Sequence, residues 1–235
     1  MELWISGGSW ISAFGSATLS EGRGVEVSSD EPLLPEAKDL FSEPLKRYGR
    51  FDDFTRLGCA AASLALGDTS IEMEKGVGTS GMIISSDYEV FRTDMDYYET
   101  SIEEGGIYSS PNLFSYTLPV ILLGECAIHY KMTGPTFCVG DGGTLGLHAL
   151  EGAASMIASG KADRMIAGWL ESPPLNAIDE NGNPPLSGAV FIVLDGKRGN
   201  LLPSERKIFH ENNTFHDSKG LEIKSLTDIF SSREN

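Results

Sequence analysis

A chain of 235 residues, 40% of them hydrophobic, is long enough to bury a substantial core, and its mean hydropathy of −0.12 is that of a globular protein. Its net charge of −16 argues against nucleic acids and anionic membranes as partners. The longest apolar runs, 118–124 and 189–194, are too short to span a bilayer, and the first residues lack the basic start of a signal peptide. We therefore expect a cytoplasmic protein with no membrane span.

The cysteines and histidines suggest no metal chemistry. Cys59, Cys126 and Cys138 lie in apolar segments and form no CxxC pair, a pattern typical of buried free thiols in a reducing compartment. The four histidines have no zinc-ligand spacing. We expect neither a metal nor a cofactor.

The first part of the chain alternates short strands with helices. Residues 3–6 predict a strand that ends in a turn at Gly7 and Gly8. Residues 50–66 have apolar side chains at helical spacing, and Asp52 lies near the start, where the helix dipole favours a negative charge.

A second strand and a second helix follow. Residues 82–85 form a short apolar run typical of a strand. The acidic stretch 87–104 has apolar residues at helical intervals, which predicts an amphipathic helix with a solvated acidic face. These apolar residues are Phe91, Met95, Tyr98 and Ile102.

The second part repeats the alternation. Residues 113–130 predict a mostly buried helix that Pro119 kinks or delays. Strand-like runs occupy 136–139, 164–167 and 186–195, and a helical segment separates the first two. This order predicts an α/β layered fold with a mixed or parallel sheet flanked by helices.

The connection after the 136–139 strand is the most informative feature. A glycine-rich corner at 140–143 leads from that strand into the following helix. Enzymes use such a strand, elbow and helix to present a nucleophile at a helix N-terminus. Here the tip of the elbow holds Gly142 and Gly143, which have no reactive side chain.

In order and spacing, these segments resemble the N-terminal half of β-ketoacyl synthases, which have a thiolase-like fold. The elbow block, 134–168, matches without a gap and is the most specific part. The corner at 85–88 resembles a short branch described as ketosynthase N-terminal-like proteins. The resemblance implies a layered thiolase-like half at 1–199, followed by a polar C-terminal extension at 200–235. Its other matching segments are 5–15, 50–62, 110–114 and 186–194.

Active members of the resembling family carry a cysteine at the elbow, and the aligned position here is Gly143. Cys138 lies five residues earlier and is expected to be a packed thiol. Thr144 follows the position, but a hydroxyl without a base is a poor nucleophile. Asp141 is expected to cap the following helix through the backbone N–H of Gly143 or Thr144.

The family's two catalytic histidines come from its C-terminal half, and this chain ends before that half would be complete. His210 and His216 lie in a polar segment without the family's surrounding glycines, so neither is assigned that role. His148 falls inside the elbow helix and is expected to be packed or partly exposed. We therefore assign no catalytic residue.

We favour a non-catalytic partner subunit that resembles a chain-length factor and serves fatty acid, polyene or polyketide synthesis. Such a subunit would form a heterodimer with a full-length ketosynthase, or a homodimer. An acyl carrier protein is a further possible partner, although the net charge of this chain disfavours an acidic carrier protein. The resemblance places the pairing strand at Thr136, Phe137, Cys138 and Val139.

Two alternatives remain open. The first is a module that binds an acyl group or another small molecule at the elbow, where backbone N–H groups would face the ligand. Its candidate residues are Asp141, Gly142, Gly143 and Thr144. The second is an acyltransferase that is active only when a partner chain supplies the missing half.

Overall fold

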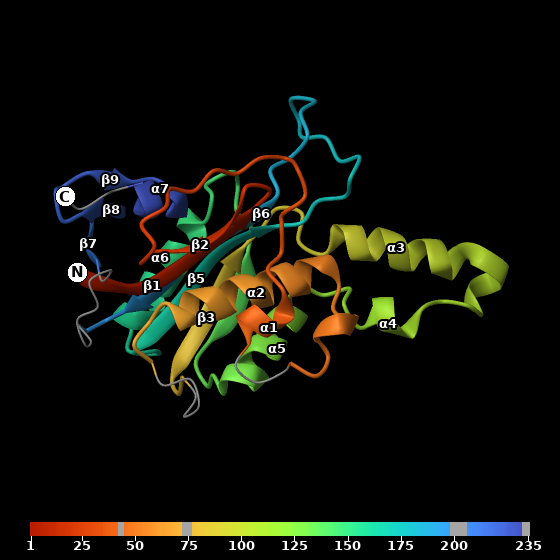
Figure 1. Ribbon diagram of the computed structural model, residues 1–235, viewed down its shortest axis with the longest axis horizontal. Helices are drawn as coiled ribbons and strands as arrows, with labels where there is room; N and C mark the ends of the chain where they lie inside the picture. Colours follow the sequence, from red (N-terminus) through yellow and green to blue (C-terminus); the bar gives the residue numbers. More distant parts are fainter. Residues whose placement is uncertain (42–44, 72–76, 198–205, 232–235) are drawn as a thin grey trace.

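The fold is a mixed nine-stranded sheet with helices on both faces (Figure 1). The computed structural model describes residues 1–41, 45–71, 77–197 and 206–231. The strand order is β4-β3-β5-β6-β1-β7-β8-β9, and β2 pairs with β1 outside this path. The strands β3, β4 and β5 are parallel, whereas the remaining pairs are antiparallel. The predicted α/β class and mixed sheet are confirmed.

The elements alternate along the chain as the sequence predicts, with additional strands near the C-terminus. The strands are β1 (Glu2–Ser12), β2 (Gly15–Thr18), β3 (Ser80–Ser85), β4 (Thr136–Val139), β5 (Arg164–Glu171), β6 (Gly188–Asp195), β7 (Arg206–Glu211), β8 (Thr214–Asp217) and β9 (Glu222–Ile223). The α-helices are α1 (Ala37–Leu40), α2 (Asp53–Gly67), α3 (Phe91–Ile102), α4 (Pro111–Phe114), α5 (Val120–Tyr130), α6 (Leu147–Ala158) and α7 (Leu226–Ser231). Short 3₁₀ turns occupy Tyr48–Arg50 and Glu103–Gly106.

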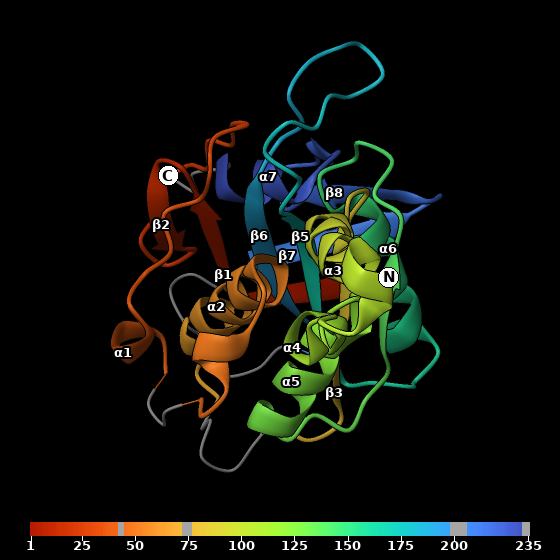
Figure 2. The same ribbon diagram turned by 90° about the vertical axis from the view of Figure 1, so that its right-hand side faces the viewer.

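The sheet buries both of its faces, because side chains on a strand alternate between the two sides. In β3, Met82 and Ile84 pack against α2 and α5, whereas Ile83 packs against the helices of the opposite face. The same alternation continues through β5 and β6. The helices α2 and α5 therefore cover one face, and α6 and α7 cover the other (Figure 2).

The predicted turn at Gly7 and Gly8 is wrong, because β1 continues through both residues to Ser12. The register against β6 shifts between Ile5 and Gly7, and both glycines are paired with β6. A Cβ atom at Gly7 would lie 2.7 Å from the carbonyl oxygen of Ala65 in α2. Glycine is needed here for close packing of a helix on a strand rather than for a reversal of the chain.

The helices α3 and α4 project from the body of the molecule (Figure 1). The predicted helix at 87–104 exists as α3, but its regularly spaced apolar residues lie in solvent, with exposed fractions of 44–59%. The prediction of a late start after Pro119 is confirmed, since α5 begins at Val120. Among the described residues, no helix is both long and apolar enough to cross a membrane.

The last described segment continues the sheet. The strand β7 pairs with β1, β8 and β9 follow as antiparallel neighbours, and the helix α7 buries Leu226, Ile229 and Phe230 on the face that α6 covers. The division of the chain at residue 199 falls outside the described residues and stays a prediction.

Candidate functional site

The elbow between β4 and α6 is a tight coil of residues 140–146. The backbone φ angles of Gly142, Gly143 and Gly146 are +63°, +74° and +95°, and Leu145 also has a positive φ of +49°. The helix α6 begins only at Leu147. The two glycines at the tip therefore precede the helix. The sequence places them at the helix N-terminus. Their backbone N–H groups form a concave cluster that suits an anion.

A carboxylate from another part of the chain fills this cluster. Oδ1 of Asp87 accepts hydrogen bonds from the N–H groups of Asp141 at 3.0 Å and Gly142 at 2.9 Å. Oδ2 accepts from the N–H of Gly143 at 3.3 Å. Asp87 follows β3 directly, so the parallel pairing of β3 with β4 places it beside the elbow. The elbow donors that would face a ligand are bonded to the protein itself.

A second carboxylate accepts hydrogen bonds from the segment that contains Asp87. Glu171, at the end of β5, accepts hydrogen bonds from the N–H groups of Asp87 at 2.5 Å and Tyr88 at 3.2 Å, and from the hydroxyl of Ser86 at 3.0 Å. Burial raises the pKa of Glu171 from its ordinary value to about 7, although these hydrogen bonds act in the opposite direction. Glu171 therefore titrates near neutral pH while it supports the segment that occupies the elbow.

A third carboxylate, that of Asp141, lies inside the elbow and is only 1% exposed. It accepts hydrogen bonds from the N–H groups of Leu145 at 2.9 Å and Gly146 at 2.8 Å, and from the hydroxyl of Ser85 at 2.7 Å. The expected bonds to the N–H groups of Gly143 or Thr144 are absent, because the left-handed glycines direct the backbone away and α6 starts later. Asp141 is a structural ligand of the elbow.

The elbow contains no activated nucleophile among the described residues. Gly143 is exposed, and a Cβ atom placed on it would meet nothing within 4 Å. The hydroxyl of Thr144 donates to the carbonyl oxygen of Asp141 at 2.8 Å and lies 3.2 Å from its Oδ1, which already accepts hydrogen bonds from Ser85 and Gly146. Nδ1 of His148 lies 2.9 Å from the carbonyl oxygen of Gly140, which ties the ring to the backbone. Burial raises the pKa of the Cys138 thiol to about 12, so this thiol is protonated at neutral pH.

The predicted pairing residues form β4, which lies at one end of the sheet and, among the described residues, pairs only with β3. Hydrogen bonds from Met82 to the carbonyl of Pro135 and from Ser86 to that of Val139 show which backbone groups face β3. Since successive residues of a strand alternate in direction, the peptide groups of Thr136 and Cys138 face outward. The structure thus places the four predicted residues together on β4, whose outer edge pairs with no other strand in the part of the chain that is described.

Comparison with known proteins agrees with this architecture. The model of the β-ketoacyl synthase N-terminal domain matches residues 35–174, which is more than half of the chain. The mixed sheet, its two helical layers and the elbow after β4 define a ketosynthase-like fold. The chain belongs to the family of the β-ketoacyl synthase N-terminal domain.

Similar sequences include 3-oxoacyl-[acyl-carrier-protein] synthases. The protein from Vibrio cholerae is 33% identical over 129 residues, which cover 54% of this chain and 31% of the relative. The protein from Rhizobium meliloti is 31% identical over 137 residues, which cover 57% and 32%. The chain thus spans about a third of the length of the curated relatives that it matches.

Similar solved structures include ketosynthases in complex with partners. The ishigamide ketosynthase/chain length factor matches with a TM-score of 0.63 and 17% identity, over 85% of this chain and 64% of the other. A ketosynthase in complex with its chain length factor from Xenorhabdus doucetiae matches with a TM-score of 0.60 and 16% identity, over 85% and 81%. A ketosynthase complex with a type II acyl-carrier protein matches with a TM-score of 0.62 and 19% identity, over 83% and 62%. At these identities the structures support the fold alone.

Asp87 and Glu171 were not among the candidate residues from the sequence. Asp87 follows the apolar strand β3, and Glu171 is the last residue of the apolar strand β5. Both therefore lie at the carboxyl ends of parallel strands, where ligand sites are common. That position was the available signal. The interaction itself joins segments far apart in the chain, which sequence spacing does not reveal.

The open space at Gly143 leads to a first prediction. Gly143→Cys is expected to fold, because no atom blocks the new side chain and the left-handed backbone costs only about 1–2 kcal/mol. The carboxylate of Asp87 should disfavour the thiolate and slow alkylation. Adding Asp87→Asn should then speed alkylation by iodoacetamide at pH 7 by about three- to tenfold, as a pKa decrease of up to about one unit requires. The rate, followed by mass spectrometry, is the measurement.

The native chain is the control, since its thiols are buried or have a raised pKa and should react slowly. Equal alkylation rates for the single and double variants would contradict the placement of Asp87 at the elbow.

Proposed function

We propose that this protein is a non-catalytic ketosynthase-like subunit that pairs with a full-length ketosynthase. The observation that carries the proposal is the elbow, where Gly143 stands at the tip and the Asp87 carboxylate occupies the surrounding N–H donors. Covalent acyl transfer needs a nucleophile, and stabilisation of the developing oxyanion needs free donors. Neither is available at this elbow, and we infer that its remaining role is structural.

The free edge of β4 supports a pairing role. Its outward peptide groups at Thr136 and Cys138 are ready to form hydrogen bonds with a strand from a second chain. Two of the solved structures with this fold are described as a ketosynthase with a chain length factor. In the proposal, β4 forms the strand contact, and the acyl carrier protein of the pathway docks on the assembled pair.

The projecting arm of α3 and α4 supplies further apolar surface. A soluble monomer rarely leaves many large apolar side chains in solvent on one projection, and such surfaces mark protein contacts. We propose that the partner covers this arm. The exposed residues on the arm and in the chain that follows it are Phe91, Met95, Tyr98, Ile102, Ile107, Tyr108, Phe114 and Leu118.

The two parts of the chain fit this arrangement. We propose that residues 1–199 provide the ketosynthase-like part and that residues 200–235 are an addition. The described strands of that addition, β7 to β9, lie at the end of the sheet opposite β4. The addition would therefore leave the pairing edge open.

Co-purification tests the proposal through a pair of variants at Thr136. A full-length ketosynthase from the same organism, co-expressed with the tagged protein, is expected to elute with it as one complex in size-exclusion chromatography. Thr136→Pro removes an outward-facing N–H donor, and it should reduce the recovered complex at least about tenfold because edge pairing loses a hydrogen bond and meets the proline ring. The matched control, Thr136→Val, keeps the donor and should retain the complex.

Two results would count against the subunit role. One is a monomer at all concentrations with no ketosynthase bound. The other is a purified protein that transfers acyl groups by itself.

A further inference from the structure

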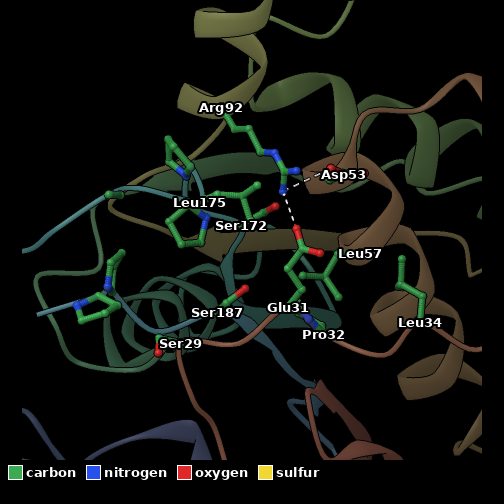
Figure 3. A pocket seen from close by; sticks show the side chains of 15 residues that line it. Ser29, Glu31, Pro32, Leu34, Asp53, Leu57, Arg92, Ser172, Leu175 and Ser187 are labelled. Carbon is green, nitrogen blue, oxygen red and sulfur yellow. Dashed lines mark hydrogen bonds and ion pairs between the residues drawn. The ribbon is translucent and has the colours of Figure 1, made fainter.

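A cavity of about 190 Å³ lies apart from the elbow, between the N-terminal ends of α2 and α3 and the loop that follows β5 (Figure 3). None of the residues that line it belongs to the elbow at 140–146. The volume is below the 300–1,000 Å³ range of pockets that hold drug-sized ligands, so an occupant would be small.

One end of the cavity is polar and centres on Arg92. Nη1 of its guanidinium pairs with Oε1 of Glu31 at 3.0 Å and with Oδ2 of Asp53 at 3.4 Å. In the part of the chain that the structure describes, its Nε and Nη2 have no hydrogen-bond partner. The hydroxyl of Ser172 lies on the same side of the cavity and likewise has no partner among the described contacts (Figure 3).

The charges at this end disfavour an ionic ligand. Two carboxylates surround one guanidinium, and the whole chain carries a net charge of −16, so an anion would be repelled. A cation would meet the guanidinium of Arg92. The remaining N–H donors of a guanidinium that is already paired with carboxylates are best matched by an uncharged acceptor, such as a carbonyl oxygen.

The other walls are largely apolar. Proline rings line the cavity from both ends of the loop between β5 and β6, and proline offers no N–H donor. The hydrogen bond from the N–H of Ser187 to the carbonyl of Ser28, 2.8 Å long, ties that loop to the N-terminal segment. The fixed φ angles of the prolines and this hydrogen bond restrict the backbone of the loop, which lowers the entropic cost of binding.

We propose that this cavity binds a small uncharged molecule with a compact apolar body and one carbonyl oxygen, such as an amide, a lactone or a ketone. The carbonyl oxygen accepts hydrogen bonds from the free N–H groups of Arg92 and from the hydroxyl of Ser172. The apolar body lies against the prolines and Leu57. This binding does not depend on the proposed subunit role.

The test compares three probes of similar shape on the full chain by two-dimensional ¹H–¹⁵N NMR titration. The probes are neutral N-cyclohexylacetamide, anionic cyclohexylacetate and cationic cyclohexylmethylammonium. The amide is expected to bind with a millimolar dissociation constant, at least about fivefold more tightly than either ion. Its shifts should fall on residues around the cavity.

Variants separate the polar contacts from the apolar walls. Arg92→Ala should weaken amide binding at least about fivefold, and Ser172→Ala should weaken it about two- to threefold, as the loss of a hydrogen bond requires. Ser172→Ala removes one small hydroxyl and keeps the Arg92 ion pairs, so it tests the proposal even if Arg92→Ala perturbs the fold. Arg47→Ala removes an ion-paired arginine elsewhere and should leave binding unchanged.

Absence of amide binding at 50 mM, the concentration chosen as the upper limit, would overturn the proposal. So would equal or tighter binding of an ionic probe, or an unchanged amide affinity in both Arg92→Ala and Ser172→Ala. Because the measurement needs no partner chain, its failure would leave the pairing proposal untouched.

Discussion

Gly81→Ala is expected to lower the free energy of unfolding by at least about 3 kcal/mol. Gly81 lies in β3, and a Cβ atom there would come 2.2 Å from the carbonyl oxygen of Pro135 and 2.8 Å from Sδ of Met165. Met165 could adjust, but the carbonyl belongs to the backbone that leads into β4. The strands β3 and β4 would have to separate, and the elbow that follows β4 would move with them.

Chemical denaturation measures this effect, and a matched glycine gives the opposite sign. Gly124 is exposed inside α5, and a Cβ atom there meets nothing within 4 Å. Gly124→Ala is therefore expected to stabilise the protein by about 0.5–1 kcal/mol, because alanine loses less conformational entropy in a helix. Similar effects for the two substitutions would contradict the close approach of β3 to Pro135.

Glu171 should make the stability of the protein depend on pH near neutrality. Its folded pKa of about 7 exceeds its ordinary value of 4.5, so the folded protein holds this proton more tightly than the unfolded chain. The stabilisation is complete below about pH 4.5 and is lost as the pH rises to about 7. The shift corresponds to about 3 kcal/mol.

The measurement is the unfolding free energy of the native chain minus that of Glu171→Gln between pH 5 and pH 8. Other carboxylates contribute equally to both proteins, so the difference isolates Glu171 and should fall as the pH increases. Glu125→Gln is the control, since Glu125 is also buried but pairs with Arg47. Parallel curves for the native chain and Glu171→Gln would show that Glu171 does not titrate in this range.

The helices and several of the strands were predictable because their signals are local. The apolar run of β4, the capping Asp52 before α2 and the proline before α5 each specify structure within a few residues, and each occurs where the sequence indicated. Oxygen Oδ1 of Asp52 accepts from the N–H of Thr55 at 3.0 Å, as an N-cap should.

The features of the fold that were not predicted depend on contacts between segments that are distant in the sequence. Gly7 and Gly8 indicated a turn because nothing nearby shows that α2 will press against them. The polar C-terminal segment gave only a weak strand signal, and it becomes a sheet because the edge of β1 is available. Periodicity predicted α3 correctly, but it does not determine whether a partner or the same chain covers an apolar stripe.

In the candidate site, too, the local features were predictable and the contacts between distant segments were not. The sequence located the elbow and its missing nucleophile, because glycines at a strand end are visible in the chain. It did not show that Asp87 would fill the elbow or that Arg92 would face a cavity, since both require the packed structure.

The central position of β1 has a consequence for the order of assembly. This strand is made before its neighbours in the sheet, since Ile11 pairs with Ala189 and Leu3 pairs with Ile208. During synthesis β1 must therefore wait, with apolar residues uncovered, until most of the chain has emerged from the ribosome. Such distant contacts slow folding and prolong exposure to aggregation. Yield in the cell is thus expected to depend on chaperones that bind β1 until its partner strands are made.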